Sequence, residues 1–363
     1  MAQRKAAGIL PAHQIAELIA AGRVVLAQLP DPDQIQPASL DLRLGPRAYR
    51  VRASFLPGPE MLVAERLNTL KLHEFDLSAG AVLETGCVYI VPLLESLALT
   101  ADLAAAANPK SSTGRLDVFT RVITDRAREF DAVPVGYHGP LYLEVSPRTF
   151  PIVVRTGSRL SQIRFRRGSA RLDDAALLRL HQQSALVDGP PHVASGLVLS
   201  IDLAGSDGIV GYRAKRHTGL IDVDRRGAQE VLDFWEPISR RGRLELVLDP
   251  DQFYILVSRE AVHVPPDYAA EMVPFDPLVG EFRVHYAGFF DPGFGHSEAG
   301  GEGSRAVLEV RSHEIPFILE HGQTVGRLVY EKMIERPKIL YGLGLGSHYQ
   351  AQGLKLSKHF RAP

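Results

Sequence analysis

The chain has 363 residues, a length that predicts about two domains, each long enough to bury a core of its own. Its 41 basic and 42 acidic residues leave a net charge of −1. The chain as a whole therefore has no excess positive charge that would attract it to a nucleic-acid polymer or an anionic membrane. A single cysteine, Cys87, excludes an internal disulfide and a zinc site built from several cysteines, and the sequence has no run of 18 uncharged apolar residues that could span a membrane. We therefore expect a soluble protein in a reducing, cytoplasmic compartment.

In chain order, residues 11–21 carry apolar side chains at helical spacing and predict a short helix. Segments rich in Val, Ile, Leu, Phe and Tyr, separated by Gly and Pro, follow at 81–93, 139–147 and 150–167. A second helix is predicted at 173–183, before a stretch of linker composition at 188–196. Strand-like segments return at 244–258, 305–312 and 315–332. Short strands at regular spacing predict a mainly β fold, a sandwich or barrel in each half.

The sequence contains an internal repeat with a spacing of 165 residues. This shift places VYI at 88–90 on FYI at 253–255, and LEV at 143–145 on LEV at 308–310. Two β domains with generic strand and turn spacing are the alternative, but they would not keep register over so many landmarks. We predict two fused β units, residues 1–170 and 197–363, joined by a helical linker at 171–196.

The strongest local signal is the polar segment at 108–115. Two cations, three hydroxyls and a glycine gather there: Lys110, Ser111, Ser112, Thr113, Gly114 and Arg115. Charged and hydroxyl donors on a backbone that a ligand can approach are typical of a phosphate cradle, although the spacing of a Walker loop is absent. A solvated polar turn is the alternative. The second half has lost the serine pair and the arginine at 275–281, so the fold does not require them.

A glutamate occurs at the same place in both halves, Glu144 and Glu309, between apolar residues of a predicted strand. Each is either an outward-facing residue of an alternating strand or a carboxylate held in a pocket as a general base. A tight turn, DPGF at 291–294, precedes Glu309 and is of a kind that lets backbone groups meet a ligand. The first half keeps only the aspartate of this turn, Asp131.

The C-terminal segment 347–360 combines polar, aromatic and basic residues, among them Tyr349, Gln350, Gln352 and Lys355. A segment of this composition at a chain end is either a frayed tail or a lid over a polyanion. The sequence alone leaves both interpretations open.

These motifs together resemble the dCTP deaminase family, which shares one β-fold superfamily with the trimeric dUTPases. The matching segments are QPASLDLRLG at 36–45, KSSTGR at 110–115, DPGF at 291–294, the two strand glutamates and HYQAQ at 348–352. They extend over nearly the whole chain. The loop at 110–115 and the tail at 348–352 are the motifs most specific to this family. Because the chain resembles a tandem, double-length member, we expect two fused dUTPase-like β-barrel or sandwich units with a few short helices.

The resemblance implies zinc-free hydrolytic deamination of dCTP to dUTP and ammonia. The strand glutamate, Glu309 or Glu144, would be the general base toward the water that attacks C4 of cytosine, and Arg115 and Ser111 would position this water and stabilise charge. The substrate-binding residues implied are Lys110, Ser112, Thr113, Gly114, Asp131, Asp291, Gly293, Phe294, Tyr349, Gln350, Gln352 and Lys355. Magnesium would be bound through the substrate triphosphate, and dTTP is a candidate inhibitor.

The sequence also departs from the family pattern. Lys110 stands where the family has arginine, so a point charge replaces a bidentate fork. The loop is degenerate in the second half, and the DPGF turn is incomplete in the first. We therefore predict a division of labour, in which the first half provides the loop and the second provides the Asp291 turn, Glu309 and the tail, with Glu144 as the competing base.

Sites in this superfamily form between neighbouring β units, so we expect a homo-oligomer with trimer-type packing of β units. Two other functions remain open from the sequence. One is a dUTP diphosphatase, alone or combined with the deaminase, because both reactions use the same fold and a triphosphate grip. The other is a non-catalytic nucleotide sensor, because one repeat has visibly decayed.

Overall fold

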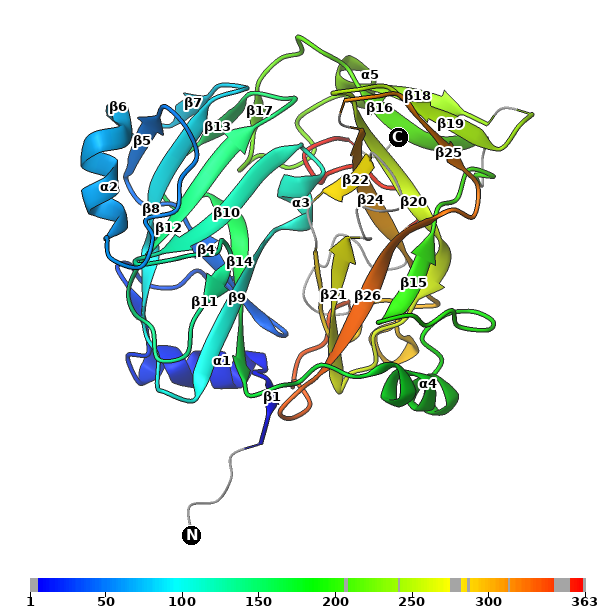
Figure 1. The fold of residues 1–363 in the computed structure, drawn as a ribbon, viewed down its shortest axis with the longest axis horizontal. Helices are drawn as coiled ribbons and strands as arrows, with labels where there is room; N and C mark the ends of the chain where they lie inside the picture. Colours follow the sequence, from blue (N-terminus) through cyan, green and yellow to red (C-terminus); the bar gives the residue numbers. More distant parts are fainter. Residues whose placement is uncertain are drawn as a thin grey trace. The chain divides into compact units, whose positions relative to one another are not determined.

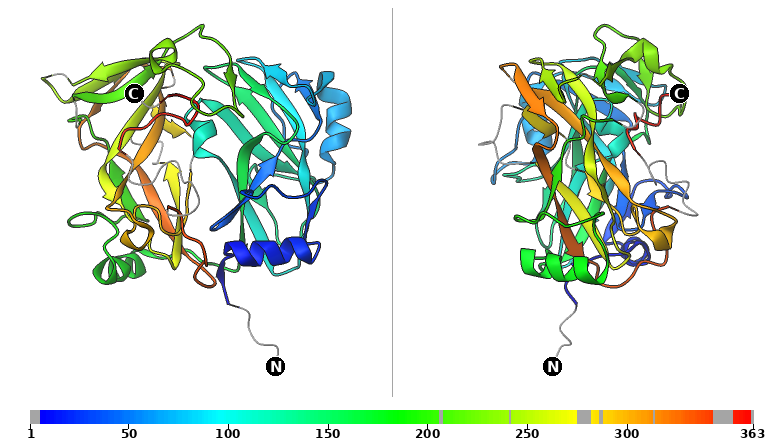
Figure 2. Two further views of the ribbon diagram at one scale, coloured as in Figure 1. Left: turned by 180° about the vertical axis from the view of Figure 1, so that it is seen from behind. Right: turned by 90° about the vertical axis from the view of Figure 1, so that its right-hand side faces the viewer.

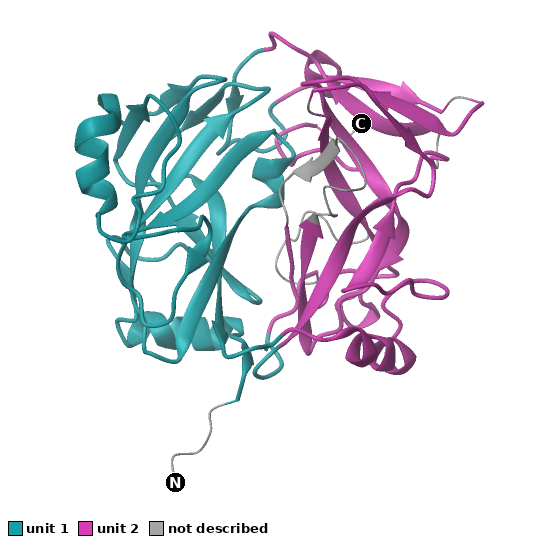
Figure 3. Cartoon of the chain, in the orientation of Figure 1, with its two compact units in different colours: residues 1–170, 219–228, 333–338 teal, residues 171–218, 229–332, 339–363 magenta. Residues whose placement is uncertain are grey.

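The computed structural model describes residues 6–205, 208–240, 242–274, 282–285, 288–312, 314–342 and 353–361. The chain forms two compact units, shown in different colours in Figure 3. Unit 1 consists of residues 1–170, 219–228 and 333–338, and unit 2 of residues 171–218, 229–332 and 339–363. The segment expected as a linker at 171–196 therefore belongs to unit 2, and two short segments from the second half of the chain belong to unit 1.

Strands dominate both units (Figure 1), which confirms the mainly β fold class. The first sheet of unit 1 has the order β11-β9-β14-β4-β3 with β1 added to β14, and the second has the order β10-β12-β8-β5-β6 with β2 added to β8. The strands of the first sheet are β1 (Gly8–Ile9), β3 (Ile35–Gln36), β4 (Ser39–Arg43), β9 (Leu103–Pro109), β11 (Ala132–Val133) and β14 (Arg159–Arg167). Those of the second are β2 (Val24–Leu26), β5 (Arg47–Val51), β6 (Lys71–Asp76), β8 (Val88–Ala98), β10 (Val118–Thr124) and β12 (His138–Pro147). Alternate side chains, such as Leu40 and Leu42 on β4 and Leu143 and Val145 on β12, are fully buried, as expected for strands that form a core.

A third, smaller sheet of unit 1 captures a segment from the second half of the chain. It joins β7 (Ala81–Leu83), β13 (Ile152–Val154) and β17 (Ile221–Asp222), with β17 parallel to β13. The Asp222 carboxylate accepts hydrogen bonds of 2.8 and 2.9 Å from the two terminal nitrogens of Arg155, and the Asp224 carboxylate accepts one of 2.7 Å from Ser158 Oγ. The hydrogen bond from Arg155 lowers the pKa of the Asp222 carboxyl. These contacts fix residues 219–228 as a strap across unit 1.

Unit 1 contains the helix predicted near the N-terminus, α1 (Ala12–Ala20), and a second one, α2 (Val63–Leu70), that the sequence did not predict. The first turn of α2 is held by carboxylates, because Val63 N donates to Asp125 Oδ1 at 2.8 Å and Leu62 N donates to Glu65 Oε2 at 2.8 Å. Its buried face joins a cluster with side chains of the second sheet: Val51, Phe55, Val63, Leu67, Leu70, Ile90, Ile123, Ala127 and Tyr142. The segment 55–70 therefore covers one face of that sheet.

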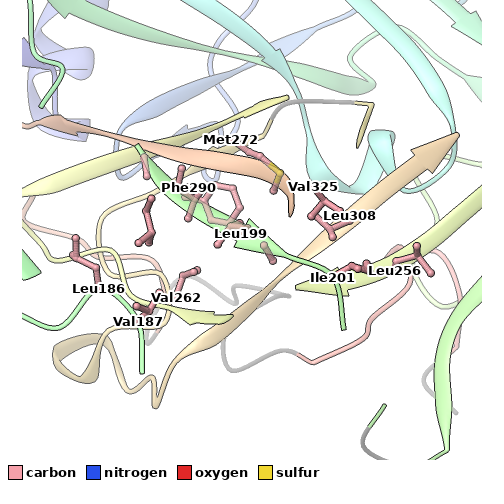
Figure 4. Packing of buried hydrophobic residues seen from close by; sticks show 14 of the residues in the cluster. Leu186, Val187, Leu199, Ile201, Leu256, Val262, Met272, Phe290, Leu308 and Val325 are labelled. Atoms are coloured by element: carbon pink, nitrogen blue, oxygen red, sulfur yellow. The ribbon is translucent and has the colours of Figure 1, made fainter. Parts of the chain in front are cut away.

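Unit 2 is also built from strands, in the orders β18-β16-β20-β24-β22 and β15-β26-β21-β23, with a separate pair β19-β25. The strands are β15 (Leu197–Ser200), β16 (Ile209–Ala214), β18 (Trp235–Ser239), β19 (Glu245–Leu248), β20 (Phe253–Val262), β21 (Tyr268–Pro274), β22 (Phe282–His285), β23 (Phe289–Phe290), β24 (Ser304–Ser312), β25 (Phe317–Glu320) and β26 (Thr324–Lys332). Its helices are α4 (Asp174–Gln183), α5 (Val231–Phe234) and the 3-10 turn η2 (Ser297–Ala299). Figure 4 shows Leu199, Met272 and Phe290 among the side chains that fill the core of this unit. None of the described helices is long and apolar enough to span a membrane.

The two units pair their strands in the same register, which confirms the repeat. In unit 1, Glu144 lies opposite Ile90 across β12 and β8, and in unit 2, Glu309 lies opposite Ile255 across β24 and β20. Both members of the second pair are the 165-residue equivalents of the first. The repeat read from the sequence is therefore a repeat of strand pairing, and Glu144 and Glu309 occupy equivalent positions.

The described part of the C-terminal segment, 353–361, is anchored to unit 2. The ring of Phe360 packs against the rings of Trp235 and Phe234, with centroids 5.9 and 5.5 Å apart. Gln229 N donates to the carbonyl oxygen of His359 at 3.1 Å, and Arg361 N donates to that of Gln229 at 2.9 Å. In Figure 2 this segment is drawn in red. The described residues 353–361 are therefore packed against unit 2.

Candidate active site

The polar loop of unit 1 is a single helical turn, α3 (Ser111–Gly114), between β9 and β10. Backbone hydrogen bonds close it, from Gly114 N to Lys110 O at 3.0 Å and from Arg115 N to Ser111 O at 3.1 Å. Lys110 N also donates to the carbonyl oxygen of Leu160 on β14 at 3.0 Å. Ser112, Thr113, Gly114 and Arg115 are buried, and Ser111 is half-buried. A solvated turn does not fit this burial, and the loop is a fixed part of unit 1.

The first residue of the loop, Lys110, is paired with acidic side chains of its own unit. Its ammonium group contacts the carboxylate of Asp41, which is buried on β4. Arg159 reaches the same carboxylate at 3.4 Å and holds Asp33 through contacts of 2.9 and 3.1 Å. The hydrogen bond from Arg159 lowers the pKa of the Asp33 carboxyl. Two cations and two carboxylates thus form a neutral cluster beside the loop, which holds the Lys110 side chain in place.

Glu144 lies on the strand pair that begins at this loop. The chain passes from α3 into β10, and β10 pairs with β12 so that Val118 faces Pro147 and Arg121 faces Glu144. Three residues along a strand correspond to roughly 10 Å, so the carboxylate and the start of β10 are that far apart along the strand. Within unit 1 the hydroxyl-rich loop therefore leads, through residues 115–117, into the strand that pairs with the strand of Glu144.

The carboxylate of Glu144 is occupied by an arginine. Arg121 Nε and a terminal nitrogen both donate to Oε1 of Glu144, at 3.1 and 2.6 Å, and the Glu144 residue is only 1% exposed. The guanidinium carbon of Arg121 lies 3.6 Å from the ring centroid of Phe130 and 4.6 Å from that of Phe119. A further hydrogen bond of 2.7 Å joins Arg121 to Ser54 Oγ. The glutamate is thus inward-facing, and its approach side is filled by a stacked guanidinium.

Glu309 occupies the equivalent place in unit 2, on β24, and is also buried. It projects from the same side of the sheet as Phe253, which faces Arg311 across β20 and β24. Trp235 packs against Phe253 with ring centroids 5.9 Å apart and also against Phe360. The C-terminal segment therefore covers the side of the sheet that carries Glu309. The backbone register places His285 of β22 opposite Glu309, where unit 1 has Arg121.

The two turns that carry an aspartate differ in conformation. Asp131 has a positive φ of 61°, and its Oδ1 accepts a hydrogen bond of 2.8 Å from Val122 N. In unit 2, a Cβ on Gly293 would lie 2.9 Å from Leu340 Cβ, so close packing requires glycine there. Phe294 packs in the core against Phe290, with ring centroids 5.0 Å apart, while Asp291 is buried next to it. Close packing accounts for both Gly293 and Phe294, and contact of these turns with substrate stays a prediction.

Three of the predicted tail residues, Tyr349, Gln350 and Gln352, lie outside the described residues. Lys355 is described and exposed, within the segment that Phe360 anchors. Among the described residues, no three His, Cys, Asp or Glu side chains gather in a group that could hold a metal ion. The role of the tail in binding a triphosphate remains a prediction.

Sequence reasoning missed the partners of the candidate residues. Asp41 lies in the quoted motif at 36–45, but nothing local connects it to Lys110, which is 69 positions away. Arg121 stands in an apolar strand and Phe130 stands in a turn. Neither residue is unusual at such a place, so neither drew attention in the sequence. One signal in the sequence could have placed Arg121 beside Glu144. Residues 118–124 and 138–147 both read as strands, and antiparallel pairing of the two brings alternate side chains of each strand opposite one another.

Comparisons with known proteins identify the family of the chain. The model of the N-terminal domain of 2'-deoxycytidine 5'-triphosphate deaminase (DCD) matches residues 6–169, and the model of its C-terminal domain matches residues 173–360. The chain belongs to the dCTP deaminase family. The resemblance found in the sequence is thereby confirmed, and the chain is an enzyme of this family.

Relatives of two lengths match the chain. A crystal structure of 2'-deoxycytidine 5'-triphosphate deaminase from Agrobacterium tumefaciens is 69% identical, covers 90% of this chain and 99% of its own, and has a TM-score of 0.88. The dCTP deaminase of Halorubrum lacusprofundi is 30% identical over 161 residues, 43% of this chain and 76% of that protein. A dUMP-forming dCTP deaminase of Methanobrevibacter smithii is 28% identical over 162 residues, 43% of this chain and 79% of that protein. The tandem arrangement is thus shared with the Agrobacterium protein.

Proposed function

We propose that this enzyme converts dCTP and water to dUTP and ammonia in pyrimidine deoxynucleotide biosynthesis. The likeness to the Agrobacterium deaminase carries the proposal, because 69% identity over 99% of that chain leaves little room for a different site. The retained loop adds chemical support, since its serines and Arg115 are held in a fixed, buried turn. Both halves of the chain contribute to this proposal through different residues.

The proposed general base is Glu309. It removes a proton from water while the water oxygen bonds to C4 of cytosine, and the proton then goes to the amino group, so that the C4–N bond breaks and ammonia leaves. Glu144 is the poorer candidate because its Oε1 is paired with the Arg121 guanidinium and its Oε2 is buried. Arg115 and Ser111 are proposed to position the water and to stabilise charge at the ring.

Substrate binding is proposed to use Lys110, Ser112 and the tail residues Tyr349 and Gln352 for the triphosphate. Magnesium would be bound through the substrate triphosphate, where it would neutralise part of the phosphate charge, and zinc has no part in the proposal. A homo-oligomer and a cytoplasmic setting complete it. The neutral cluster of Lys110, Arg159, Asp41 and Asp33 supports a positioning role for Asp41, because the Asp41 carboxylate contacts the lysine and orients it.

The test is an assay of the purified chain with dCTP and magnesium that measures ammonia and pyrophosphate separately. Ammonia without pyrophosphate supports the proposal, and a failure to release ammonia while dCTP binds would instead favour a nucleotide sensor. Glu309→Gln is expected to slow ammonia release by about 10²–10⁴-fold, whereas Glu144→Gln is expected to retain it. Full activity in Glu309→Gln would refute the assignment of the base.

A second candidate function is deamination combined with hydrolysis of dUTP to dUMP and pyrophosphate. Some relatives, such as that of Methanobrevibacter smithii, carry the name dUMP-forming dCTP deaminase, which favours this candidate over a diphosphatase alone. Equal amounts of ammonia and pyrophosphate from dCTP would support it. Turnover of added dUTP would distinguish a free diphosphatase activity from a coupled one.

A further inference from the structure

The strap at 219–228 covers one edge of a strand pair in unit 1. Its strand β17 lies parallel to β13, on the side of β13 opposite β7 (Figure 1). Ile221 N donates to the carbonyl oxygen of Pro151 at 3.1 Å. Val223 N donates to that of Val153 at 3.2 Å. The strap therefore occupies backbone groups that an edge strand would otherwise present to solvent.

Unit 2 repeats this strand pair without a strap. The pair β19-β25 is the 165-residue equivalent of β7-β13, with Val247 opposite Ile318 where unit 1 has Val82 opposite Val153. Among the described strands, β25 pairs with β19 alone. The Ile318 residue is 57% exposed. The outer edge of β25 is therefore open in the described part of the chain.

The backbone of Ile318 is turned toward this open edge. His321 N donates to the carbonyl oxygen of Leu244 at 2.9 Å, so these two residues form a hydrogen-bonded pair next to the strands. Hydrogen-bonded and non-hydrogen-bonded pairs alternate in an antiparallel ladder, which makes Ile318 and Val247 a non-hydrogen-bonded pair. The N–H and C=O of Ile318 therefore point away from β19, as the C=O of Val153 does where it meets the strap.

The charge beside the edge is reversed between the two units. In unit 1, Arg155 holds the strap through hydrogen bonds of 2.8 and 2.9 Å to Asp222 and one of 3.3 Å to Asp224. The 165-residue equivalent of Arg155 is Glu320, an exposed residue of β25, and Glu245 lies opposite it on β19. A strap with two aspartates would be repelled by these carboxylates, whereas a segment with cations at the same positions would be attracted.

The edge also leaves apolar surface to be covered. In unit 1, Ile221 of the strap lies beside Ile152 of β13, and both residues are fully buried. Phe317, the equivalent of Ile152, is only half-buried. A strand with an apolar residue beside Phe317 and a cation at the next position would cover this surface and bring its charge near Glu320.

We propose that the outer edge of β25 binds an extended segment of a partner protein in which apolar residues alternate with Lys or Arg. The segment adds as a parallel strand, as β17 does in unit 1, and donates a backbone N–H to the carbonyl oxygen of Ile318. Its cations lie beside Glu320. The same glutamate disfavours the strap of another copy of the chain, so it also reserves the strap for unit 1.

The test measures the fluorescence anisotropy of short labelled peptides with the full-length chain. The aspartate peptide copies residues 218–224 with capped ends, and the lysine peptide has lysine in place of both aspartates. The proline peptide is the lysine peptide with proline in place of Val223, so it keeps the charge and lacks the N–H that meets Val153 in the strap. Glu320→Arg copies the charge of unit 1, and Glu17→Arg, at an exposed glutamate of α1, is the matched control.

The wild-type chain is expected to bind the lysine peptide at least about tenfold more tightly than the aspartate or the proline peptide. Glu320→Arg is expected to reverse the preference between lysine and aspartate, and Glu17→Arg to leave it unchanged. Glu320→Gln, which serves where the arginine variant folds poorly, is expected to weaken binding of the lysine peptide.

Three results would overturn the proposal. One is the absence of saturable binding of the lysine peptide by the wild-type chain. Another is equal binding of the lysine and proline peptides, which would show attraction by charge without strand addition. The third comes from sedimentation velocity, because an oligomer that Ile318→Lys dissociates would show that a second copy of the chain occupies the edge. An unchanged order of affinities in Glu320→Arg would refute the role of Glu320.

Discussion

Glu144→Gln separates a structural glutamate from a catalytic one. The Glu144 residue is 1% exposed, and the side chain of its partner Arg121 is 24% exposed, so the substitution removes a buried charge and leaves a cation that water can partly reach. Breaking a fully buried ion pair costs about 3–5 kcal/mol. In the variant, the Arg121 guanidinium still stacks on Phe130, still donates to Ser54 Oγ and is still partly hydrated. We therefore expect a smaller loss, about 1–2 kcal/mol, in the free energy of unfolding of unit 1.

For a unit of this size, such a loss lowers Tm by about 2–8 °C. Differential scanning calorimetry and dCTP turnover on the same preparation measure both effects. We expect Glu144→Gln to lower Tm while kcat stays within about twofold of the wild type, and Glu309→Gln to lower kcat by about 10²–10⁴-fold. A drop of kcat by 10²-fold in Glu144→Gln with an unchanged Tm would refute the reasoning, since it would make Glu144 the base.

Three further substitutions test other parts of the structure. Phe360→Ala removes the ring that anchors the C-terminal segment on Trp235. Limited proteolysis should then cut that segment faster, and the KM for dCTP should rise. Faster cleavage with an unchanged KM would show that the segment does not take part in substrate binding. Gly293→Ala places a Cβ 2.9 Å from Leu340 Cβ and should lower Tm, whereas a raised KM with an unchanged Tm would show that the turn meets substrate directly. Asp222→Asn removes the negative charge that pairs with Arg155 in the strap. Because folding lowers the pKa of the Asp222 carboxyl below 3.8, the ionised carboxylate stabilises the folded chain above pH 3.8, and this stabilisation is lost as the pH falls further. Urea unfolding should therefore show a gap between wild type and Asp222→Asn at neutral pH that closes below pH 3.8, and a gap independent of pH would contradict this.

The sequence by itself determined the fold class, the repeat and the family. Strand periodicity, turn residues and motifs such as residues 110–115 and 291–294 are local patterns, and each is written in consecutive residues. The 165-residue shift also fixed the equivalence of Glu144 and Glu309, because strand register follows the spacing of apolar residues along the chain.

Only the tertiary structure decided what those residues touch. The pairing of Glu144 with Arg121 depends on the register of β10 against β12, and the pairing of Lys110 with Asp41 joins residues 69 positions apart. The strap at 219–228 belongs to unit 1 although its sequence neighbours belong to unit 2, because its carboxylates find Arg155 there. Contacts between distant segments depend on the whole fold, so no local sequence pattern contains them. These contacts distinguish Glu144 from Glu309, which occupy equivalent positions in the sequence repeat.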